Sequence, residues 1–409
     1  MKKRTPEIRG TDLVFYCPKE NHYSFNALAG ALETNPYGAT RLLFAENEAG
    51  LLKAAGNLPR DGRAAVLAFS FFTSQKTDIR ALIKKLPSQK KRHFTLIAGG
   101  SHPSGAPEET LGMGFDYVFR GEGENSLPDF LKSFAAGRPP KRKIIKGNPV
   151  PCLDTYPPVS LKWGRFGPVE ITRGCPFACA YCQTSFLFGS KPRHRSLDNT
   201  LHYVRLMNGR GLRYVRFITP DAFAYGSTDG RKINLEAVKS LLEGAKAIIK
   251  DRGALFFGSF PSEVRPEHVT KETLELTRRF ADNKRLVIGA QSASPRLLKA
   301  IHRGHSVDDV YNSVKLCAKY GFKADVDFIF GLPGETEKDL EETFKFILKI
   351  VPLGARIHAH TFMPLPGTPF ENKRPSLLAK KTEDFIRALA SKGQAFGQWE
   401  KQQTVNDGR

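Results

Sequence analysis

Short apolar runs alternate with amphipathic stretches along the first third of the chain. Five such runs are visible, at residues 13–17, 41–46, 64–70, 93–100 and 116–124. The stretches between them have helical spacing, as at residues 24–32 and 78–86. Apolar strands that alternate with helices are typical of a parallel sheet covered on both faces. The pattern predicts a doubly wound, Rossmann-like α/β domain over residues 1–135, with ligand loops at the carboxyl ends of its strands.

The pattern breaks after this domain and then resumes. Residues 136–165 are rich in Pro and Lys and lack periodicity, which predicts a linker. Strand-like runs follow at residues 168–172, 214–219, 254–260, 286–292, 325–331 and 356–362. Six βα units predict a partial (β/α)6 barrel over residues 166–372, with its chemistry at the carboxyl ends of the strands. Residues 373–409 are expected to form a basic C-terminal helix and a tail.

Length and composition support two globular domains. The chain has 409 residues, of which 40% are hydrophobic and 25% are charged. No apolar run has the length of a membrane span. The basic start of the chain lacks the apolar stretch of a secretory signal. We therefore expect no membrane span and a cytoplasmic location.

The strong positive charge raises the question of an anionic partner. The formal net charge is +22, and basic residues cluster at residues 84–92, 138–146 and 191–195. Such a surface can attract nucleic acid, anionic lipid or a phosphorylated substrate. No recognisable nucleic-acid-binding motif accompanies the charge. A solvated basic surface is the favoured interpretation, and no nucleic-acid partner is expected.

The cysteines point to a metal site. The chain has six, at Cys17, Cys152, Cys175, Cys179, Cys182 and Cys317. Three of them fall within eight residues, in RGCPFACAYC, just after a predicted strand, whereas a disulfide framework would be spread differently in a shorter chain. Thiolates are the usual ligands of iron–sulfur clusters. A four-iron cluster normally has four protein ligands, so three thiolates leave one iron open to a substrate, as in catalytic zinc sites.

Other interpretations of the cysteines stay open at this point. A zinc site would want a fourth Cys or His at short spacing, and His194 is a remote candidate. Three unpaired thiols are a further alternative. Cys152 or Cys317 can also approach the three cysteines in space and supply a fourth ligand.

CPFACAYC resembles the Cys-x3-Cys-x2-Cys signature of the radical S-adenosylmethionine (SAM) superfamily. The resemblance implies that Cys175, Cys179 and Cys182 are catalytic residues that bind a 4Fe–4S cluster, whose open iron chelates SAM. In that family, an electron from the reduced cluster splits SAM into methionine and a 5′-deoxyadenosyl radical. The family also needs an electron donor, such as ferredoxin or flavodoxin.

The same resemblance implies further SAM-binding residues at the ends of the barrel strands. The candidates are Tyr181, Asp221, Ser259, Ser262, Glu263, Gln291, Ser292 and Arg303. The turn at residues 330–336 and the loop at residues 363–370 resemble two further loops of the family. ITPDAF stands where the family has Gly-Gly-Glu, so the contact to the SAM amino group is not assigned. Each of these features, taken alone, can equally be structural.

The amino-terminal domain lacks Gly-x-Gly-x-x-Gly after its first strand, so a dinucleotide is not expected. Its strand ends instead resemble those of cobalamin-binding domains. The matching positions are Ser70, Thr73, Gly99, Gly100, Gly121 and Gly123. Small residues there let a ligand approach the backbone. His22 occupies the position of the family's cobalt ligand, but Glu20 and Phe25 replace its Asp and Gly, so we expect cobalamin binding without dependence on His22.

The order of these motifs along the chain resembles radical SAM enzymes with an N-terminal cobalamin-binding domain. This implies cobalamin-dependent methyl transfer, or related radical chemistry, on a small-molecule substrate. One alternative is a tRNA methylthiotransferase-like enzyme. Those enzymes carry three more cysteines in the amino-terminal domain and a C-terminal RNA-binding β-barrel, whereas that domain here has only Cys17, and residues 373–409 are too few for such a barrel. Another alternative is a redox sensor that binds cluster or cobalamin without radical catalysis.

Overall fold

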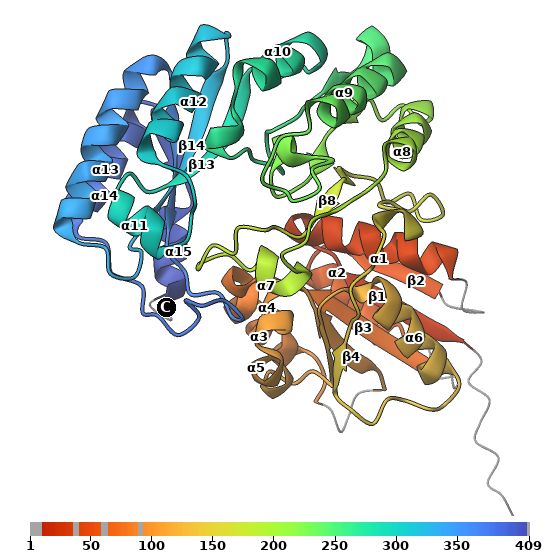
Figure 1. Ribbon diagram of the computed structural model, residues 1–409. Coiled ribbons are helices and arrows are strands. Elements are labelled where there is room, and N and C mark those ends of the chain that lie inside the picture. The colour runs from red at the N-terminus through yellow and green to blue at the C-terminus, as the bar shows by residue number, and fades with distance from the viewer. Residues whose placement is uncertain (1–9, 36–40, 59–63, 89–92, 407–409) are drawn as a thin grey trace, which may run out of the picture. The chain divides into compact units, whose positions relative to one another are not determined.

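The computed structural model describes residues 10–35, 41–58, 64–88 and 93–406. The chain divides into two compact units, Met1–Gly167 and Pro168–Arg409, each with its own set of strands (Figure 1). The basic start of the chain and Lys90, Lys91 and Arg92 lie outside the described residues. Within the described part, no helix is both long enough and apolar enough to cross a membrane.

The first unit is built on a parallel sheet. Among its described residues, six strands pair in the order β2-β1-β3-β4-β5-β6. They are β1 (Thr11–Tyr16), β2 (Arg41–Ala45), β3 (Ala64–Ser70), β4 (Thr95–Gly99), β5 (Tyr117–Arg120) and β6 (Ile144–Lys146). The order confirms the predicted doubly wound α/β fold. The chain adds β2 on one side of β1 and the later strands on the other side, beginning with β3. The carboxyl ends of β1 and β3 therefore form the switch point where such sheets bind ligands.

Helices cover both faces of this sheet. They are α1 (His22–Thr34), α2 (Glu48–Gly56), α3 (Lys76–Lys85), α4 (Ser101–Gly105), α5 (Pro107–Gly112) and α6 (Gly123–Ala135). Phe15 of β1 belongs to a buried cluster with Phe25 of α1 and Phe130 of α6. The neighbouring Val14 belongs to a second cluster, with Leu51 of α2. Because side chains alternate along a strand, one apolar run feeds both clusters.

Part of the segment predicted to be a linker is a strand. Ile144 to Lys146 form β6, which pairs with β5 at the edge of the sheet. Further on, the Val150 amide donates to Glu122 Oε2 at 2.8 Å, and Asn26 Nδ2 donates to the Phe166 carbonyl at 3.0 Å. Three residues are too few to show a strand period, which explains why the Pro- and Lys-rich composition dominated the prediction.

The second unit is an open arc of parallel strands. Those described pair as follows: β7 (Val169–Glu170) with β11 (Phe217–Ile218), β10 (Tyr214–Val215) with β12 (Ala254–Leu255), and β13 (Arg285–Gln291), β14 (Lys323–Phe330) and β15 (Arg356–Thr361) in sequence. A bridge between Val264 and Ile288 joins the chain after β12 to β13. This arrangement confirms the predicted partial barrel.

The helices of this unit lie between the strands in sequence and pack on their outer face. They are α8 (Leu197–Gly209), α9 (Leu235–Ile249), α10 (Lys271–Phe280), α11 (Pro295–Ala300), α12 (Val307–Lys319) and α13 (Glu337–Ile350). On β14, Phe328 and Phe330 contact the rings of Phe346 and Phe344 of α13, respectively. The alternating residue Asp327 therefore points to the opposite, inner face of the strand.

The C-terminal segment adds to the barrel. It forms α14 (Lys380–Ser391), β16 (Ala395–Gly397) and α15 (Trp399–Asn406), where the sequence predicted a helix and a tail. β16 pairs in parallel with β15, and the Thr361 amide of β15 donates to Gln402 Oε1 of α15 at 2.8 Å. The segment thus continues the sheet beyond the sixth predicted strand.

Candidate functional site

The cysteine loop leaves the sheet through a sharp turn. β8 (Thr172–Arg173) pairs with β9 (Arg193–His194), and α7 (Thr184–Phe188) follows the loop. Gly174 has φ +91°, and a Cβ there would lie 2.8 Å from the Lys191 carbonyl oxygen. Only glycine fits this turn without strain.

Hydrogen bonds fix the loop to the rest of its unit. The Ala180 amide donates to the Ile301 carbonyl at 3.0 Å, and the Ala180 carbonyl accepts from the Phe370 amide at 3.2 Å. Ser185 Oγ donates to the Cys175 carbonyl at 2.6 Å. Loops that follow β13 and β15 therefore hold the cysteines at the carboxyl ends of the strands, as the sequence predicted.

The three thiols lie in a shielded environment. Cys179 is buried, and Cys175 and Cys182 are partly buried. Burial raises the pKa of Cys182 to about 11 and also raises that of Cys175, and the neighbouring thiols add to both shifts. Such thiols lose their protons when a metal binds, since a coordinated thiol is deprotonated outright. Cys175 and Cys182 therefore stay protonated at neutral pH until a cation binds them.

Two other cysteines are candidates for a fourth ligand. Cys152 is exposed and belongs to the first unit. Cys317 is fully buried on α12, and burial alone raises its pKa to about 12.

Arg303 places a positive charge beside the cysteines. Its Nη1 lies 3.7 Å from Cys179 Sγ, and its Nη2 donates to the Gly289 carbonyl at 2.6 Å. Burial works to lower the pKa of Arg303, but Tyr181, Cys179 and Glu263 hold it above its usual range. Its buried Nε has no hydrogen-bond partner among the described residues. A buried cation with a spare donor fits an anionic group bound at this point.

Three predicted SAM-binding residues converge on Gly289 of β13. A Cβ at this glycine would lie 2.5 Å from Arg303 Nη2, 2.9 Å from Gln291 Nε2 and 2.9 Å from Glu263 Oε2. Burial, with the charge of Asp327 adding to it, raises the pKa of Glu263 to about 7. A guanidinium, an amide and a carboxyl group at one point can bind a zwitterion such as an amino acid.

Other predicted residues have partners within the protein. Asp221 Oδ2 bonds His268 Nδ1 at 2.5 Å, Ser262 Oγ donates to the Phe217 carbonyl at 2.5 Å, and Ser292 Oγ accepts from the Ser294 amide at 3.1 Å. Ser259 Oγ accepts from Arg216 at 3.4 Å. Tyr181 packs against a buried apolar cluster that includes Leu297 and Ile301, and burial raises its pKa well above the usual range. Tyr181 is thus close to Cys179 and Arg303, whereas Asp221 and Ser262 are engaged locally.

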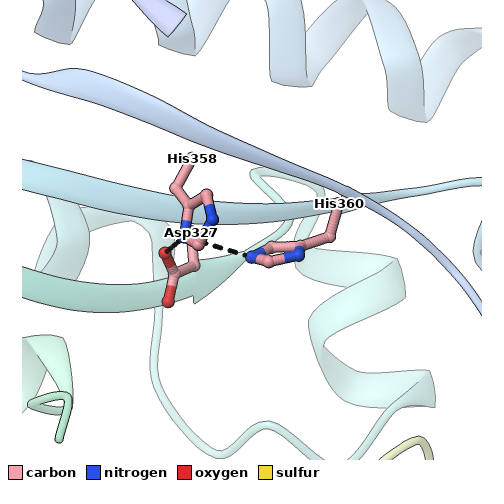
Figure 2. A group of neighbouring side chains, drawn as sticks. All are labelled: Asp327, His358 and His360. Carbon is pink, nitrogen blue, oxygen red and sulfur yellow. Dashed lines mark hydrogen bonds and ion pairs between the residues drawn. The ribbon is translucent and has the colours of Figure 1, made fainter. Parts of the chain in front are cut away.

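Sequence reasoning missed a polar group on the inner face of the barrel. Asp327 of β14 lies against His358 of β15, and His360 follows on the same face of β15 (Figure 2). A signal for them exists in the sequence, because polar residues recur at every second position in DVD and in HAH inside otherwise apolar strands.

In the first unit, the predicted cobalamin positions line neighbouring strand ends. Gly100 has φ +97°, and a Cβ there would lie 2.8 Å from both the Phe71 amide nitrogen and Ser70 Oγ. Thr73 Oγ1 bonds His102 Nδ1 at 3.2 Å. The Gly121 amide donates to Ser104 Oγ at 3.0 Å. The loops after β3, β4 and β5 are therefore closely packed together.

Two glycines of this group differ in the space around them. A Cβ at Gly99 would meet only Phe119 Cβ, at 3.7 Å, so this position is open. A Cβ at Gly123 would lie 2.8 Å from Leu28 Cδ2. Gly99 thus leaves room for a ligand over the end of β4, whereas Gly123 makes room for α1.

The loop around His22 explains its departure from the cobalamin motif. The Phe25 ring lies 4.6 Å from the Phe15 ring, in the core, where the family has glycine. Asn21 Nδ2 donates to the Ser70 carbonyl, and Asn21 also bonds Gln75. His22 Nε2 is buried and has no hydrogen-bond partner in the described part of the chain. A buried nitrogen without a partner at the switch point is consistent with a bound ligand there.

Comparison with known proteins assigns both units to families. Residues 169–347 match the radical SAM superfamily, and residues 25–131 match the B12 binding domain. "Uncharacterized methyltransferase PH0819" of Pyrococcus horikoshii is 26% identical over 70% of this chain. The chain spans 64% of the length of that relative. The tRNA-2-methylthio-N(6)-dimethylallyladenosine synthase of Sulfurihydrogenibium is 27% identical over 57% of this chain and 52% of its own.

Solved structures show the same fold. The radical SAM methyltransferase TsrM of Kitasatospora setae, with cobalamin and a 4Fe–4S cluster bound, superposes with a TM-score of 0.66 at 15% identity, over 89% of this chain and 74% of its own. The cobalamin-dependent radical SAM enzyme OxsB gives a TM-score of 0.62 at 17% identity, over 83% and 52%. The two family matches show that the chain carries a B12-binding domain ahead of a radical SAM domain, so the cofactors of its domains are a 4Fe–4S cluster, SAM and cobalamin.

Proposed function

We propose that the chain is a cobalamin-dependent radical SAM enzyme that transfers a methyl group, or carries out a related radical reaction, on a small-molecule substrate. The observation that carries the proposal is the position of Arg303. Its guanidinium contacts the Cys179 sulfur and meets Gln291 and Glu263 over Gly289. A thiol loop for a cluster and a zwitterion-binding group are thereby joined in one place.

Each part of the chain has a distinct role in this proposal. When bound, the cluster would supply an electron to SAM, and cobalamin would supply a methyl group. Cys175, Cys179 and Cys182 hold the cluster. Arg303 binds the SAM carboxylate, and Glu263 accepts a hydrogen bond from the SAM amino group. The loops that begin at Gly100 and Gly121 bind cobalamin through their backbone.

The reaction also needs a reductant, and we propose a small electron-transfer protein such as ferredoxin or flavodoxin, in the cytoplasm. The net charge of +22 supports an acidic donor, because a basic surface steers an anionic protein to it. The free state of all six cysteines is in keeping with a reducing compartment.

The test is anaerobic reconstitution followed by reduction with dithionite. We expect about four irons per chain, the stoichiometry of one cubane, and production of 5′-deoxyadenosine from SAM. Cys179→Ala should abolish both, whereas Cys152→Ala, at an exposed cysteine of the other unit, should change neither. A colourless zinc protein would contradict the cluster. A loaded cluster that never cleaves SAM would instead support the redox sensor.

The methylthiotransferase alternative has support in the relatives but not in the thiols of this chain. A second cluster would need three further cysteines in the first unit. That unit has Cys17, which is fully buried with its pKa raised to about 11 by burial, and the exposed Cys152. An iron content near eight per chain, the value for two cubanes, would revive this alternative.

A further inference from the structure

The inner face of β14 and β15 carries a compact group of three polar side chains. Asp327 Oδ1 lies 2.8 Å from His358 Nδ1, and His360 Nε2 lies 3.2 Å from the same Nδ1. The three ligand atoms all lie within 4.8 Å of one another. Figure 2 shows the three side chains turned toward a common point from two neighbouring strands.

Hydrogen bonds among the three side chains explain this arrangement poorly. A neutral imidazole has one ring N–H, so His358 Nδ1 either donates to Asp327 or accepts from His360. It cannot do both, although both neighbours lie within hydrogen-bond distance. With the proton of each ring on its outer nitrogen, the three inner atoms would all offer electron pairs to one point, which is the arrangement that a cation requires.

The distances and the donor types fit a transition metal. Ligand atoms about 2.0–2.2 Å from one ion lie roughly 3.0–3.5 Å apart when they share a face of the coordination shell. The 2.8 Å and 3.2 Å separations are close to this range. Two imidazoles with one carboxylate suit ions such as Zn²⁺, Fe²⁺ or Co²⁺, whereas Mg²⁺ and Ca²⁺ take oxygen ligands.

We propose that Asp327, His358 and His360 bind one divalent transition-metal ion inside the barrel. Three protein ligands leave at least one position for water or for an electron-pair donor of a bound ligand. Asp327 is paired in register with Gly289, so the ion would share the inner face with the convergent residues described above. Metal binding by this group does not depend on the proposed radical chemistry.

Neighbouring residues hold the two histidines in place. The His358 ring stacks on Phe396 of β16, with centroids 4.4 Å apart and planes 2° apart. Gln402 Oε1 is held by the Thr361 amide, which turns Gln402 Nε2 toward His360 Nδ1 at 3.4 Å. If a metal binds His360 Nε2, the ring proton is on Nδ1 and needs a hydrogen-bond acceptor. Gln402 Nε2 is a donor and cannot accept that proton. Gln402→Glu supplies that acceptor and keeps an oxygen for Thr361.

The experiment uses the full chain with Cys175, Cys179 and Cys182 changed to Ala, which removes the competing thiols and the colour of the cluster. Anaerobic titration with Co²⁺, followed by visible d–d absorption, should show one ion per chain. His358→Ala with His360→Ala in this background should weaken binding by about 100-fold or more, because loss of even a supporting residue costs 10–100-fold. His202→Ala, on the exposed face of α8, is the matched control and should change nothing.

Gln402→Glu separates a metal site from a hydrogen-bonded cluster that is only structural. We expect it to tighten Co²⁺ binding by about tenfold, through the carboxylate–histidine–metal arrangement. Asp327→Asn should weaken binding, and it serves as a second test if the double histidine variant loses its fold by circular dichroism. The proposal is overturned if the parent chain binds no Co²⁺, or if binding is the same in the parent, the histidine variants and Gln402→Glu. Because the cluster is absent throughout, this result is independent of SAM cleavage.

Discussion

Gly289 contributes to the candidate site by lacking a side chain. It lies inside β13 with an extended backbone, so the conformation itself does not demand glycine. The lack of space does require glycine, because Arg303, Gln291 and Glu263 approach within 2.9 Å of where a Cβ would be. A single methyl group would therefore displace three side chains at once.

Gly289→Ala should impair SAM cleavage while leaving the fold intact. Displacement of Arg303 by about 1 Å is expected to lower the rate roughly 100-fold, a typical cost of misplacing a positioning residue. The measurement is 5′-deoxyadenosine formation by the reconstituted variant, with iron content as the check on the cluster. Gly209→Ala, where a Cβ would meet nothing within 4 Å, is the control. Normal cleavage by Gly289→Ala would remove these residues from the SAM site.

His102 gives the first unit a predictable response to acid. Its side chain is 1% exposed, and burial lowers its pKa to about 4. The unfolded chain binds a proton at this histidine near pH 6.5, whereas the folded chain does so only near pH 4. The unfolded state therefore holds more protons in this window, and stability falls as the pH falls from about 6.5 to 4. The shift corresponds to roughly 3 kcal/mol.

His102→Gln should remove this part of the pH dependence. Urea unfolding at several pH values between 7 and 4.5 should show a smaller loss of free energy in the variant than in the wild type. His202→Gln, at an exposed histidine, should keep the wild-type slope. Parallel curves for wild type and His102→Gln would show that the pKa of His102 is the same in the folded and the unfolded chain.

At the scale of elements, the apolar runs predict where the strands lie, but they do not predict which strands pair or in which register. The run at residues 325–331 predicts β14, and the run at 356–362 predicts β15. That Asp327 faces His358 depends on the register between these strands, which no local pattern contains. The three-residue strands β6 and β16 are too short to show a period. Asp221 stands at a strand end as expected, but His268, 47 residues later, bonds its carboxylate.

The loop between β4 and α4 is the element on which cobalamin binding is tested. Gly100→Leu adds a side chain where even a Cβ would lie 2.8 Å from Ser70 Oγ and Phe71 N, at φ +97°. We expect it to block uptake of hydroxocobalamin, which the wild type should bind about one to one, while the cluster in the other unit still forms. Gly112→Leu, at an open position of α5, is the control.

His22→Ala is the companion experiment on α1. We expect its cobalamin absorption spectrum to match that of the wild type, because the loop departs from the cobalt-ligand motif at Phe25, which fills the core. A changed spectrum would instead identify His22, whose Nε2 is buried without a partner among the described residues, as the cobalt ligand.

For the whole molecule, the net charge of +22 predicts weak, salt-sensitive binding to any polyanion. Affinity for RNA should fall steeply as salt rises from 50 to 200 mM. The loss should be about 10³-fold if six phosphates are contacted. Fluorescence polarisation with labelled tRNA and with an unrelated RNA should give similar affinities. A tRNA-specific complex that survives at physiological salt would favour an RNA-modifying role.

The Pro168 boundary and the added strand β16 set the order in which the molecule can form during synthesis. The sheet of the first unit is complete once residue 146 has been made, so that unit can fold while the rest is still being translated. The second unit has no such early endpoint. Its sheet gains β16 only at residues 395–397, and the Thr361 amide finds its partner only when Gln402 has been made. The cysteine loop is therefore synthesised more than 200 residues before the last strand of its own unit, so it emerges into an unfinished fold.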